Sequence, residues 1–225
     1  MAIFQSLWLG TLGEIERLSI RSFLYHGHEF HLYAYENVGE VPKGTVLKDA
    51  RDILPLRLYP DKAIFADLWR YYMLYSIGNW WTDLDIICYG DMKAYENDDF
   101  VAGKESFPVS STCNALIKST AGAKYMKWMI DEAEKRFEVL GPRSKIGPML
   151  LTECIKNFKL QPKPLSEFYD FYVQDWIIPW SSPPTSHCVH LWSQAWRDMR
   201  LNINASYHYD SNIERIRRKY KETEC

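Results

Sequence analysis

The sequence has little of what a disulfide framework or a membrane span requires. Its five cysteines are odd in number and widely spaced, and no Cys-x-x-Cys pair occurs, which argues against a disulfide scaffold and a structural zinc site. No apolar run approaches the roughly 20 residues of a membrane helix, and the first residues lack the basic flank of a signal peptide. We therefore expect a cytoplasmic protein in a reducing setting.

Other absences narrow the function further. The net charge is only −2, so no basic surface for a nucleic-acid partner is expected. The glycine-rich motifs of P-loop and dinucleotide-binding proteins are missing, as is the Gly-x-Ser-x-Gly motif of serine hydrolases. Repeats and low-complexity tracts are missing too. Apolar residues make up 47% and charged residues 25% of the chain, which is typical of a globular protein.

Aromatic residues, in contrast, are plentiful. Nine tryptophans and fifteen tyrosines are many for 225 residues. Their flat, half-polar rings stabilise cores, but they also suit nucleotide bases and sugar rings. Composition alone does not decide between these uses.

Strands alternate with helices in the first half of the sequence. This order predicts an α/β protein with a mostly parallel sheet. From apolar periodicity and end signals we expect strands over 3–9, 29–35 and 80–88. Helices are expected over 14–25, 61–76, 121–140 and 148–157, with Asp61 as an N-cap and Pro148 in a first turn.

Two carboxylates in the predicted strand 80–88 are the most informative feature. Side chains alternate along a strand, so Asp83 and Asp85 would point the same way, about 7 Å apart. On a covered strand two such charges repel each other and lose solvation. A divalent cation such as Mg²⁺ or Mn²⁺ would neutralise them. Alternatively, the strand ends here and both carboxylates meet water or arginine.

The helix before this strand carries an acid and a base on one face. Asp67 and Arg70 are three residues apart, and hence neighbours on the helix surface. An exposed pair of this kind would contribute only about 0.2–0.5 kcal/mol. Because the surrounding helix is strongly apolar, we expect the pair to be partly buried. It would then present a carboxylate and a guanidinium to a polyhydroxylated ligand.

These residues together resemble a known signature. The series Asp67-x-x-Arg70-Tyr71, Leu74-Tyr75-x-x-Gly78 and Asp83-Leu84-Asp85 is similar to that of glycosyltransferases with a DXD-containing sugar-binding region. Yeast initiating mannosyltransferases and α-1,4-galactosyltransferases belong to that family, and clostridial glucosylating toxins are distant relatives. The resemblance implies a GT-A fold, which is Rossmann-like, with a mostly parallel central sheet flanked by helices and a small second sheet. Gly78-Asn79 departs from the family's frequent Gly-Gly.

The resemblance also assigns roles. Asp67 and Arg70 would hold the donor's sugar hydroxyls and phosphate. Asp85 would bind Mn²⁺ or Mg²⁺ directly, and Asp83 would complete the metal site by bridging to the ribose, the sugar or a metal-bound water. Asp83, Asp85 and Arg70 are accordingly the expected catalytic residues.

Two further segments match the family. In the opening strand, Trp8 would stack on the nucleotide base beside Leu9, although a tryptophan packed in the core is the alternative. Near the other end, the segment Val189–Trp196 resembles a closing His-x-Trp motif. There His190 would complete the metal shell, and Ser193 and Trp196 would reach the diphosphate. Weaker matches suggest sugar contacts for Asn114 and Gly147.

The function implied is that of a retaining, metal-dependent hexosyltransferase in polysaccharide biosynthesis. The donor would be a UDP-sugar, or alternatively a GDP-sugar, and the acceptor a hydroxyl of a glycan or lipid-linked molecule. A non-catalytic nucleotide-sugar or carbohydrate-binding module, or a nucleotidyltransferase, remains open. We expect one domain over 1–225, with a nucleotide-sugar-binding half (about 1–105), an acceptor-side half (about 106–210) and a basic C-terminal tail (211–225).

Two charged segments carry weaker expectations. The basic tail reads as a solvated helix, with peripheral contact to an anionic membrane as the alternative. The series His26-x-His28-x-x-His31 looks like a zinc site. We do not expect one, because His28 and His31 would lie on opposite faces of a strand.

Overall fold

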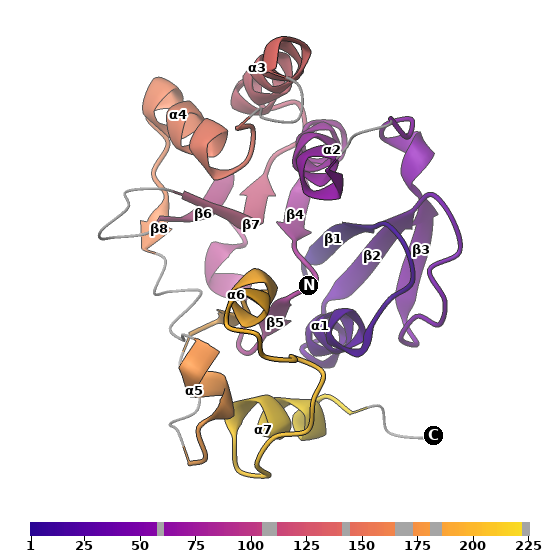
Figure 1. Cartoon of the computed structure of the whole chain (residues 1–225). Coiled ribbons are helices and arrows are strands. Elements are labelled where there is room, and N and C mark those ends of the chain that lie inside the picture. Colours follow the sequence, from indigo (N-terminus) through magenta and orange to yellow (C-terminus); the bar gives the residue numbers. More distant parts are fainter. Residues whose placement is uncertain (58–60, 105–111, 141–144, 165–172, 181–185, 222–225) are drawn as a thin grey trace.

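A seven-stranded mixed sheet forms the centre of the molecule (Figure 1). The computed structural model describes residues 1–57, 61–104, 112–140, 145–164, 173–180 and 186–221. Across the sheet the strands are ordered β3-β2-β1-β4-β7-β6-β8. Their bounds are β1 Ile3–Trp8, β2 Glu29–Ala34, β3 Thr45–Asp49, β4 Asn79–Thr82, β6 Phe100–Lys104, β7 Thr112–Ser119 and β8 Lys163–Pro164.

The sheet is mostly parallel, as predicted. Strands β3, β2, β1 and β4 run parallel, β7 is antiparallel to β4 and β6, and β8 is parallel to β6. From β1 the chain builds outward through β2 and β3, and then returns to add β4 on the other side of β1. At the point where the strand order reverses, the loops that follow the two neighbouring strands lead to opposite sides of the sheet. The crevice between these loops is a common place for a ligand to bind.

Helices cover both faces of the sheet (Figure 1). On one face, α2 (Lys62–Ser76), α3 (Lys124–Leu140) and α4 (Pro148–Phe158) share a core with Leu7 and Tyr33. On the other face lies α1 (Glu14–Tyr25), whose Phe23 packs with Phe4 and Phe30. Because side chains alternate along a strand, β1 and β2 supply both cores at once. Helix α1 has its predicted bounds, and the Asp61 carboxylate caps α2 by accepting a bond from the Ala63 N–H at 2.8 Å.

A smaller layer packs against α1. Strands β5 (Ile86–Cys88) and β9 (Cys188–His190) form a two-stranded antiparallel sheet, and helices α5 (Val173–Ile177), α6 (Ser193–Asp198) and α7 (Asn212–Lys219) pack near it. Helix α7 belongs to the predicted basic tail, but its Ile213 and Ile216 are buried. The tail is therefore a docked helix rather than a solvated one, up to the limit of the described residues at 221. Two short 3₁₀ helices, η1 (Ala50–Asp52) and η2 (Lys93–Tyr95), complete the described elements.

No helix in the described ranges is both long and apolar enough to cross a membrane.

The prediction of one continuous strand over 80–88 is wrong. Strand β4 ends at Thr82, a turn follows at Leu84 and Asp85, and β5 begins at Ile86 in the other sheet. The apolar run is long enough for one strand, but it serves two sheets with different partners. Asp83 and Asp85 therefore lie at the crossing between sheets rather than two apart on one strand face.

The turn before β4 explains the Gly78-Asn79 pair. Both residues have positive φ, at 73° for Gly78 and 67° for Asn79. Glycine adopts this region freely, and asparagine tolerates it better than most residues. A Cβ on Gly78 would also lie only 2.6 Å from the Ala121 backbone nitrogen. Glycine is thus needed at 78, whereas asparagine at 79 meets the same backbone demand as a second glycine.

We expect Gly78→Ala to lower the free energy of unfolding by about 2–4 kcal/mol, because backbone strain and a clash with Ala121 add together. Gly122→Ala is the matched control, since Gly122 has a φ of 71° but open space around its missing Cβ. That control should lose only about 1 kcal/mol, from strain alone. Urea unfolding measures both, and equal losses would contradict the close approach at Gly78.

Candidate functional site

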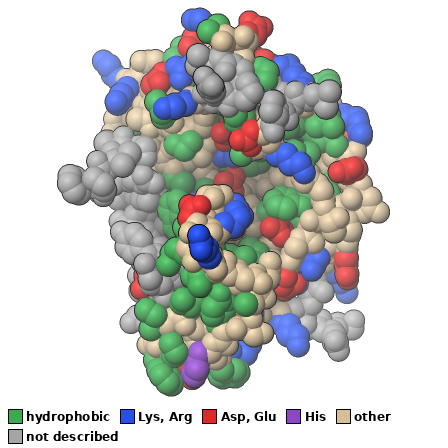
Figure 2. Space-filling view, in the orientation of Figure 1, with side chains coloured by type: hydrophobic (Ala, Val, Ile, Leu, Met, Phe, Trp, Pro, Cys, Tyr) green, Lys and Arg blue, Asp and Glu red, His purple; other side chains and the backbone are tan. Residues whose placement is uncertain are grey.

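A cavity of about 430 Å³ opens where the growth of the sheet reverses between β1 and β4. Figure 2 shows acidic side chains gathered in a hollow beside the protruding α6 segment. The cavity walls come from the ends of β1 and β4, from α1 and α2, and from the segment at and after α6. The lining residues that the argument uses are Trp8, Glu16, Arg70, Asp83, Asp85, Ser193, Arg197 and Asn204.

Arg70 of α2 is the central cation of the first charged group. Its guanidinium lies 3.1 Å from the Asp67 carboxylate and 3.3 Å from the Asp83 carboxylate. It also donates to the backbone oxygen of Asn114 and lies over the Trp81 ring, 4.6 Å from its centroid. Only 4% of Arg70 is exposed. One buried guanidinium thus ties α2, β4 and β7 together at the cavity wall.

The acids of this group resist ionisation. Burial raises the pKa of Asp67 to about 6, even though the neighbouring Arg70 acts to lower it. Burial also raises the pKa of Asp83, with Arg70 again opposing and Asp85 adding repulsion. The side-chain amide of Asn114 donates a hydrogen bond of 2.8 Å to the Asp67 carboxylate and holds it in place. Arg70 alone therefore does not offset the full cost of burying two ionised carboxylates.

Asp85 and His190 form the second charged group. The His190 Nε2 lies 3.2 Å from the Asp85 carboxylate, whose other oxygen accepts the Ser193 backbone N–H at 3.0 Å. Antiparallel pairing of β5 with β9 sets this contact, because the Leu191 N–H bonds to the Asp85 backbone oxygen at 2.8 Å. The Trp192 ring stacks on the His190 ring at 3.9 Å.

Each partner of this pair shifts the pKa of the other. Burial alone would raise the pKa of Asp85, but His190 and the Ser193 N–H outweigh it and lower that pKa. Burial alone would lower the pKa of His190, but the Asp85 carboxylate raises it to about 10. His190 is therefore an imidazolium at neutral pH.

The charges of the two groups can be counted. Ionised Asp67, Asp83 and Asp85 contribute three negative charges, and Arg70 and the His190 imidazolium contribute two positive charges. One negative charge remains uncompensated. A divalent cation that replaced the His190 proton would bring the sum to zero, with oxygen and nitrogen ligands of the kind that Mn²⁺ and Mg²⁺ accept.

The predicted metal ligands do not form a ready cage. In the described parts of the chain, no three His, Cys, Asp or Glu side chains converge as a metal site would require. Asp85 touches His190, whereas Asp83 is bonded to Arg70 and to the Trp81 indole N–H at 2.8 Å. This donor set suits a cation that takes one or two protein ligands and completes its shell with substrate phosphates and water, as Mg²⁺ commonly does.

The other predicted site residues divide between the cavity and the core. Trp8 lines the cavity, and Leu9 lies next along the chain with its backbone oxygen accepting the Lys62 amine at 3.3 Å. Gly147 precedes α4 so close to Asp67 that a Cβ there would lie 2.6 Å from a carboxylate oxygen. Asn114 and Gly147 thus both border Asp67.

Trp196 is not brought to the cavity. It is fully buried, and its indole N–H donates to the Leu191 backbone oxygen at 2.7 Å. Helix α6 turns Ser193 toward Asp85 and, three residues later, turns Trp196 into the core. The predicted contact between Trp196 and the diphosphate has no support in this placement.

Sequence reasoning missed Glu16, Arg197 and Asn204, which also line the cavity. Burial raises the pKa of Glu16, against backbone N–H groups that lower it, including that of Gly13 at the start of α1. Glu16 is the third helical residue after Gly13, the position from which an acid reaches back to the N-cap N–H, and this signal could have placed Glu16 at the helix end that faces the cavity. Arg197 and Asn204 carry no such local signal.

His26, His28 and His31, which resemble a zinc site in the sequence, each contact a different side chain. His26 bonds to the Tyr220 hydroxyl at 3.1 Å, and His31 bonds to Glu29. His28 is buried against Phe4, with ring centroids 5.0 Å apart.

Comparison with known proteins supports the architecture. No protein-family model matches the chain, and no curated protein matches it in sequence. Among solved structures, the PaToxG glycosyltransferase has a TM-score of 0.57 at 14% identity, covering 70% of this chain and 69% of that one. Apo-form GlyE, a glycosyltransferase of Streptococcus pneumoniae TIGR4, has a TM-score of 0.58 at 13% identity.

The chain has the GT-A fold. The match with apo GlyE covers 99% of this chain but only 60% of GlyE. A second GlyE structure gives a TM-score of 0.52 at 14% identity, with 98% and 60% covered. The predicted fold class is thereby confirmed, including the small second sheet. Membership of the DXD-containing family stays a prediction.

The charge pair at His190 makes stability depend on pH. Its pKa is raised from 6.5 to about 10 in the folded chain, so its stabilisation is fully present below pH 6.5 and is lost as pH rises toward 10. In EDTA-treated protein, we expect the free energy of unfolding to fall by on the order of 2–3 kcal/mol between pH 7 and 9.5. Urea unfolding of the His190→Gln variant should show a flatter profile, and an unchanged slope would contradict the assignment.

Proposed function

We propose that this chain is a metal-dependent glycosyltransferase that moves a sugar from a nucleotide-sugar donor to a hydroxyl acceptor. The observation that carries the proposal is the meeting of two charged groups, Asp67–Arg70–Asp83 and Asp85–His190, at one cavity of a GT-A fold. The proposed donor is a UDP-sugar, with a GDP-sugar as the alternative. The proposed acceptor is a glycan or a lipid-linked molecule.

Trp8 is the proposed platform for the base. It ends β1 and lines the cavity, and it also packs against the core cluster that contains Phe4 and Trp80. Its indole Nε1 is buried, and within the described ranges no group accepts a bond from it. A buried donor without a partner calls for an explanation, and an oxygen of a bound nucleotide would supply the acceptor. Base–aromatic stacking contributes about 1–3 kcal/mol per base.

Arg70 and Asp67 are the proposed holders of the donor's sugar and phosphate. Both are fixed before any ligand binds, Arg70 by Asn114 and Trp81, and Asp67 by Asn114. Preorganised charges stabilise a developing charge without a cost of reorientation. The missing Cβ at Gly147 keeps space open beside the Asp67 carboxylate.

Asp85 is the proposed direct metal ligand, with His190 beside it and Asp83 acting through water or the donor. A bound Mn²⁺ or Mg²⁺ would supply electrostatic stabilisation of the leaving diphosphate. Without a metal ion, the positive charge beside the Asp85 carboxylate is that of the His190 imidazolium. His190 must lose that proton to act as a ligand.

Retention of anomeric configuration is part of the proposal. Asp67 and Asp83 engage Arg70, and Asp85 engages His190, so none of these acids is placed as a dedicated base. This pairing supports attack from the face of the leaving group, where the departing phosphate oxygen would remove the acceptor's proton. A binding module would release no product, and a nucleotidyltransferase would release pyrophosphate rather than nucleoside diphosphate.

We expect Asp85→Asn to abolish sugar transfer and to weaken Mn²⁺ binding at least tenfold, while leaving the fold intact. The amide keeps the shape of the side chain but removes the charge that attracts the cation. Release of nucleoside diphosphate measures transfer, calorimetry measures metal binding, and circular dichroism checks the fold.

Asp131→Asn is the control for this experiment, because Asp131 is an exposed acid of α3 paired only with Lys127 among the described contacts. Its activity should equal that of the wild type. Full activity of Asp85→Asn, or of the wild type in excess EDTA, would refute the metal-dependent assignment.

Trp8→Leu should weaken binding of UDP with Mn²⁺ by roughly 5- to 100-fold, since the leucine offers no flat ring to the base. Trp180→Leu is the matched control, because Trp180 is 71% exposed and lies outside the cavity lining. Calorimetry with UDP, GDP, CDP and ADP also identifies the base. An unchanged dissociation constant in Trp8→Leu for the tightest nucleotide would rule out stacking on Trp8.

A further inference from the structure

Two cysteines face each other across the small sheet. In the antiparallel pairing of β5 with β9, Cys88 is the register partner of Cys188. Backbone hydrogen bonds join Asp85 with Leu191 and Tyr89 with His187. Hydrogen-bonded and non-hydrogen-bonded pairs alternate along such a ladder, so Cys88 and Cys188 form a non-hydrogen-bonded pair. In such pairs the Cα atoms lie about 4.5 Å apart, which falls within the range of about 4.4–6.8 Å that disulfides span.

The two cysteines are neighbours across the strand pair. Both are free and fully buried. The Cys88 thiol donates to the Gly90 backbone oxygen at 3.5 Å, and the Cys188 thiol donates to the Met92 sulfur at 3.8 Å. The neighbouring Cys188 side chain and the His28 ring lower the pKa of Cys88. By contrast, burial raises the pKa of the solitary Cys154 to about 12. A low thiol pKa favours the nucleophilic thiolate.

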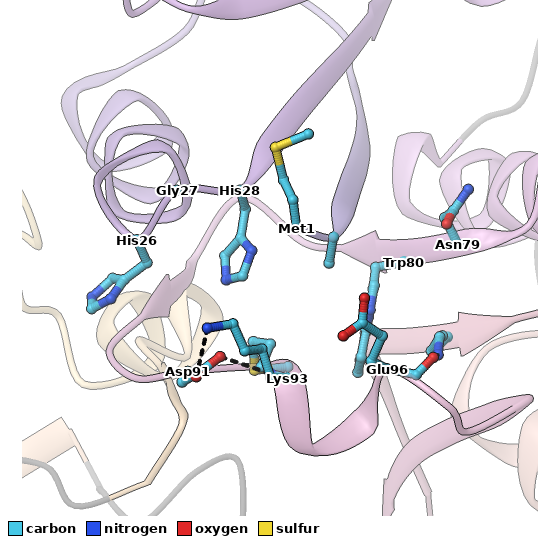
Figure 3. A pocket seen from close by; sticks show the side chains of 12 residues that line it. Met1, His26, Gly27, His28, Asn79, Trp80, Asp91, Lys93 and Glu96 are labelled. Carbon is cyan, nitrogen blue, oxygen red and sulfur yellow. Dashed lines mark hydrogen bonds and ion pairs between the residues drawn. The ribbon is translucent and has the colours of Figure 1, made fainter.

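A second cavity, of about 570 Å³, lies at the N-terminal ends of β1, β2 and β4. It is therefore at the opposite end of the large sheet from the charged site. Figure 3 shows the His28 ring pointing into it toward the segment that carries Asp91 and Lys93. Met92 also lines this cavity, and its sulfur lies 3.8 Å from the Cys188 sulfur. The Met92 side chain therefore lies between the cavity and the Cys188 thiol.

We propose that Cys88 and Cys188 are a redox-active dithiol, which a small hydroperoxide entering through the His28 cavity oxidises to an intrachain disulfide. The register of β5 with β9 brings the sulfurs together, and His28 lies beside the thiol that reacts first. The proposal does not depend on sugar transfer.

The chemistry balances in two steps. The Cys88 thiolate attacks one oxygen of hydrogen peroxide, the O–O bond breaks, and a sulfenic acid and hydroxide form. The Cys188 sulfur then attacks the Cys88 sulfur, the S–O bond breaks, and water leaves with the Cys188 proton. In sum, two thiols and one peroxide yield one disulfide and two waters. A thiol reductant reverses the change by exchange.

The disulfide would join the two strands that carry the second charged group. Cys88 lies three residues after Asp85, and Cys188 two residues before His190. The new bond would also close a loop of about 100 residues and so restrict the unfolded chain. Oxidised protein should therefore unfold at a higher temperature than reduced protein.

The test treats the reduced full chain with hydrogen peroxide, blocks remaining thiols, and maps tryptic peptides by mass spectrometry without reduction. Peptide 71–93 holds only Cys88, and peptide 160–197 holds only Cys188. We expect these two peptides to be linked, with a Tm raised by several degrees, and both changes to vanish on adding dithiothreitol. Cys154→Ala, the control, should behave as the wild type.

The Cys188→Ala variant separates the two steps. It should form no linked peptide and should instead accumulate a sulfenic acid at Cys88, which dimedone traps. The proposal is overturned if wild-type protein shows no link between peptides 71–93 and 160–197, or if Cys88 is oxidised no faster than Cys154. This readout needs no sugar donor, so its failure would leave the proposed transferase activity standing.

Discussion

The neutralisation of three clustered carboxylates is the constraint on which the site depends. Asp67, Asp83 and Asp85 come from a helix, the end of a strand and a turn. Asp83 and Asp85 line one cavity, and Asp67 pairs with Arg70 in its wall. Arg70 offsets the first two and His190 the third. An unpaired charge in such surroundings is costly, so the backbone elements that bring these cations into place are as important to the site as the acids themselves.

That constraint explains why the chain changes sheets between Asp83 and Asp85. Strand β4 belongs to the large sheet beside Arg70, while β5 pairs with β9, which carries His190. Crossing from one sheet to the other gives each aspartate its own cation. The short segment Thr82–Ile86 thus joins the two layers of the fold and sets the two charged groups side by side. One continuous strand could not supply both partners.

Sequence reasoning was most successful where the signal is local. The Asp61 cap, the span of α1 and the Asp67–Arg70 pair all depend on residues within a few positions of each other. It failed where tertiary partners decide, because the apolar run around Asp83 and Asp85 reads the same whether it serves one sheet or two. Trp196 and the Cys88–Cys188 pair show the same limit, since their surroundings come from strand register and helix packing that no nearby residue encodes.

The most direct test of the central claim is a crystal structure of the full chain with UDP and Mn²⁺, with the metal located by its anomalous scattering. We expect a manganese peak beside the Asp85 carboxylate, with diphosphate oxygens in its shell and uracil against Trp8. Manganese and nucleotide bound away from the cavity, with the Asp85–His190 contact unaltered, would contradict the claim that a divalent cation completes the neutralisation of these acids.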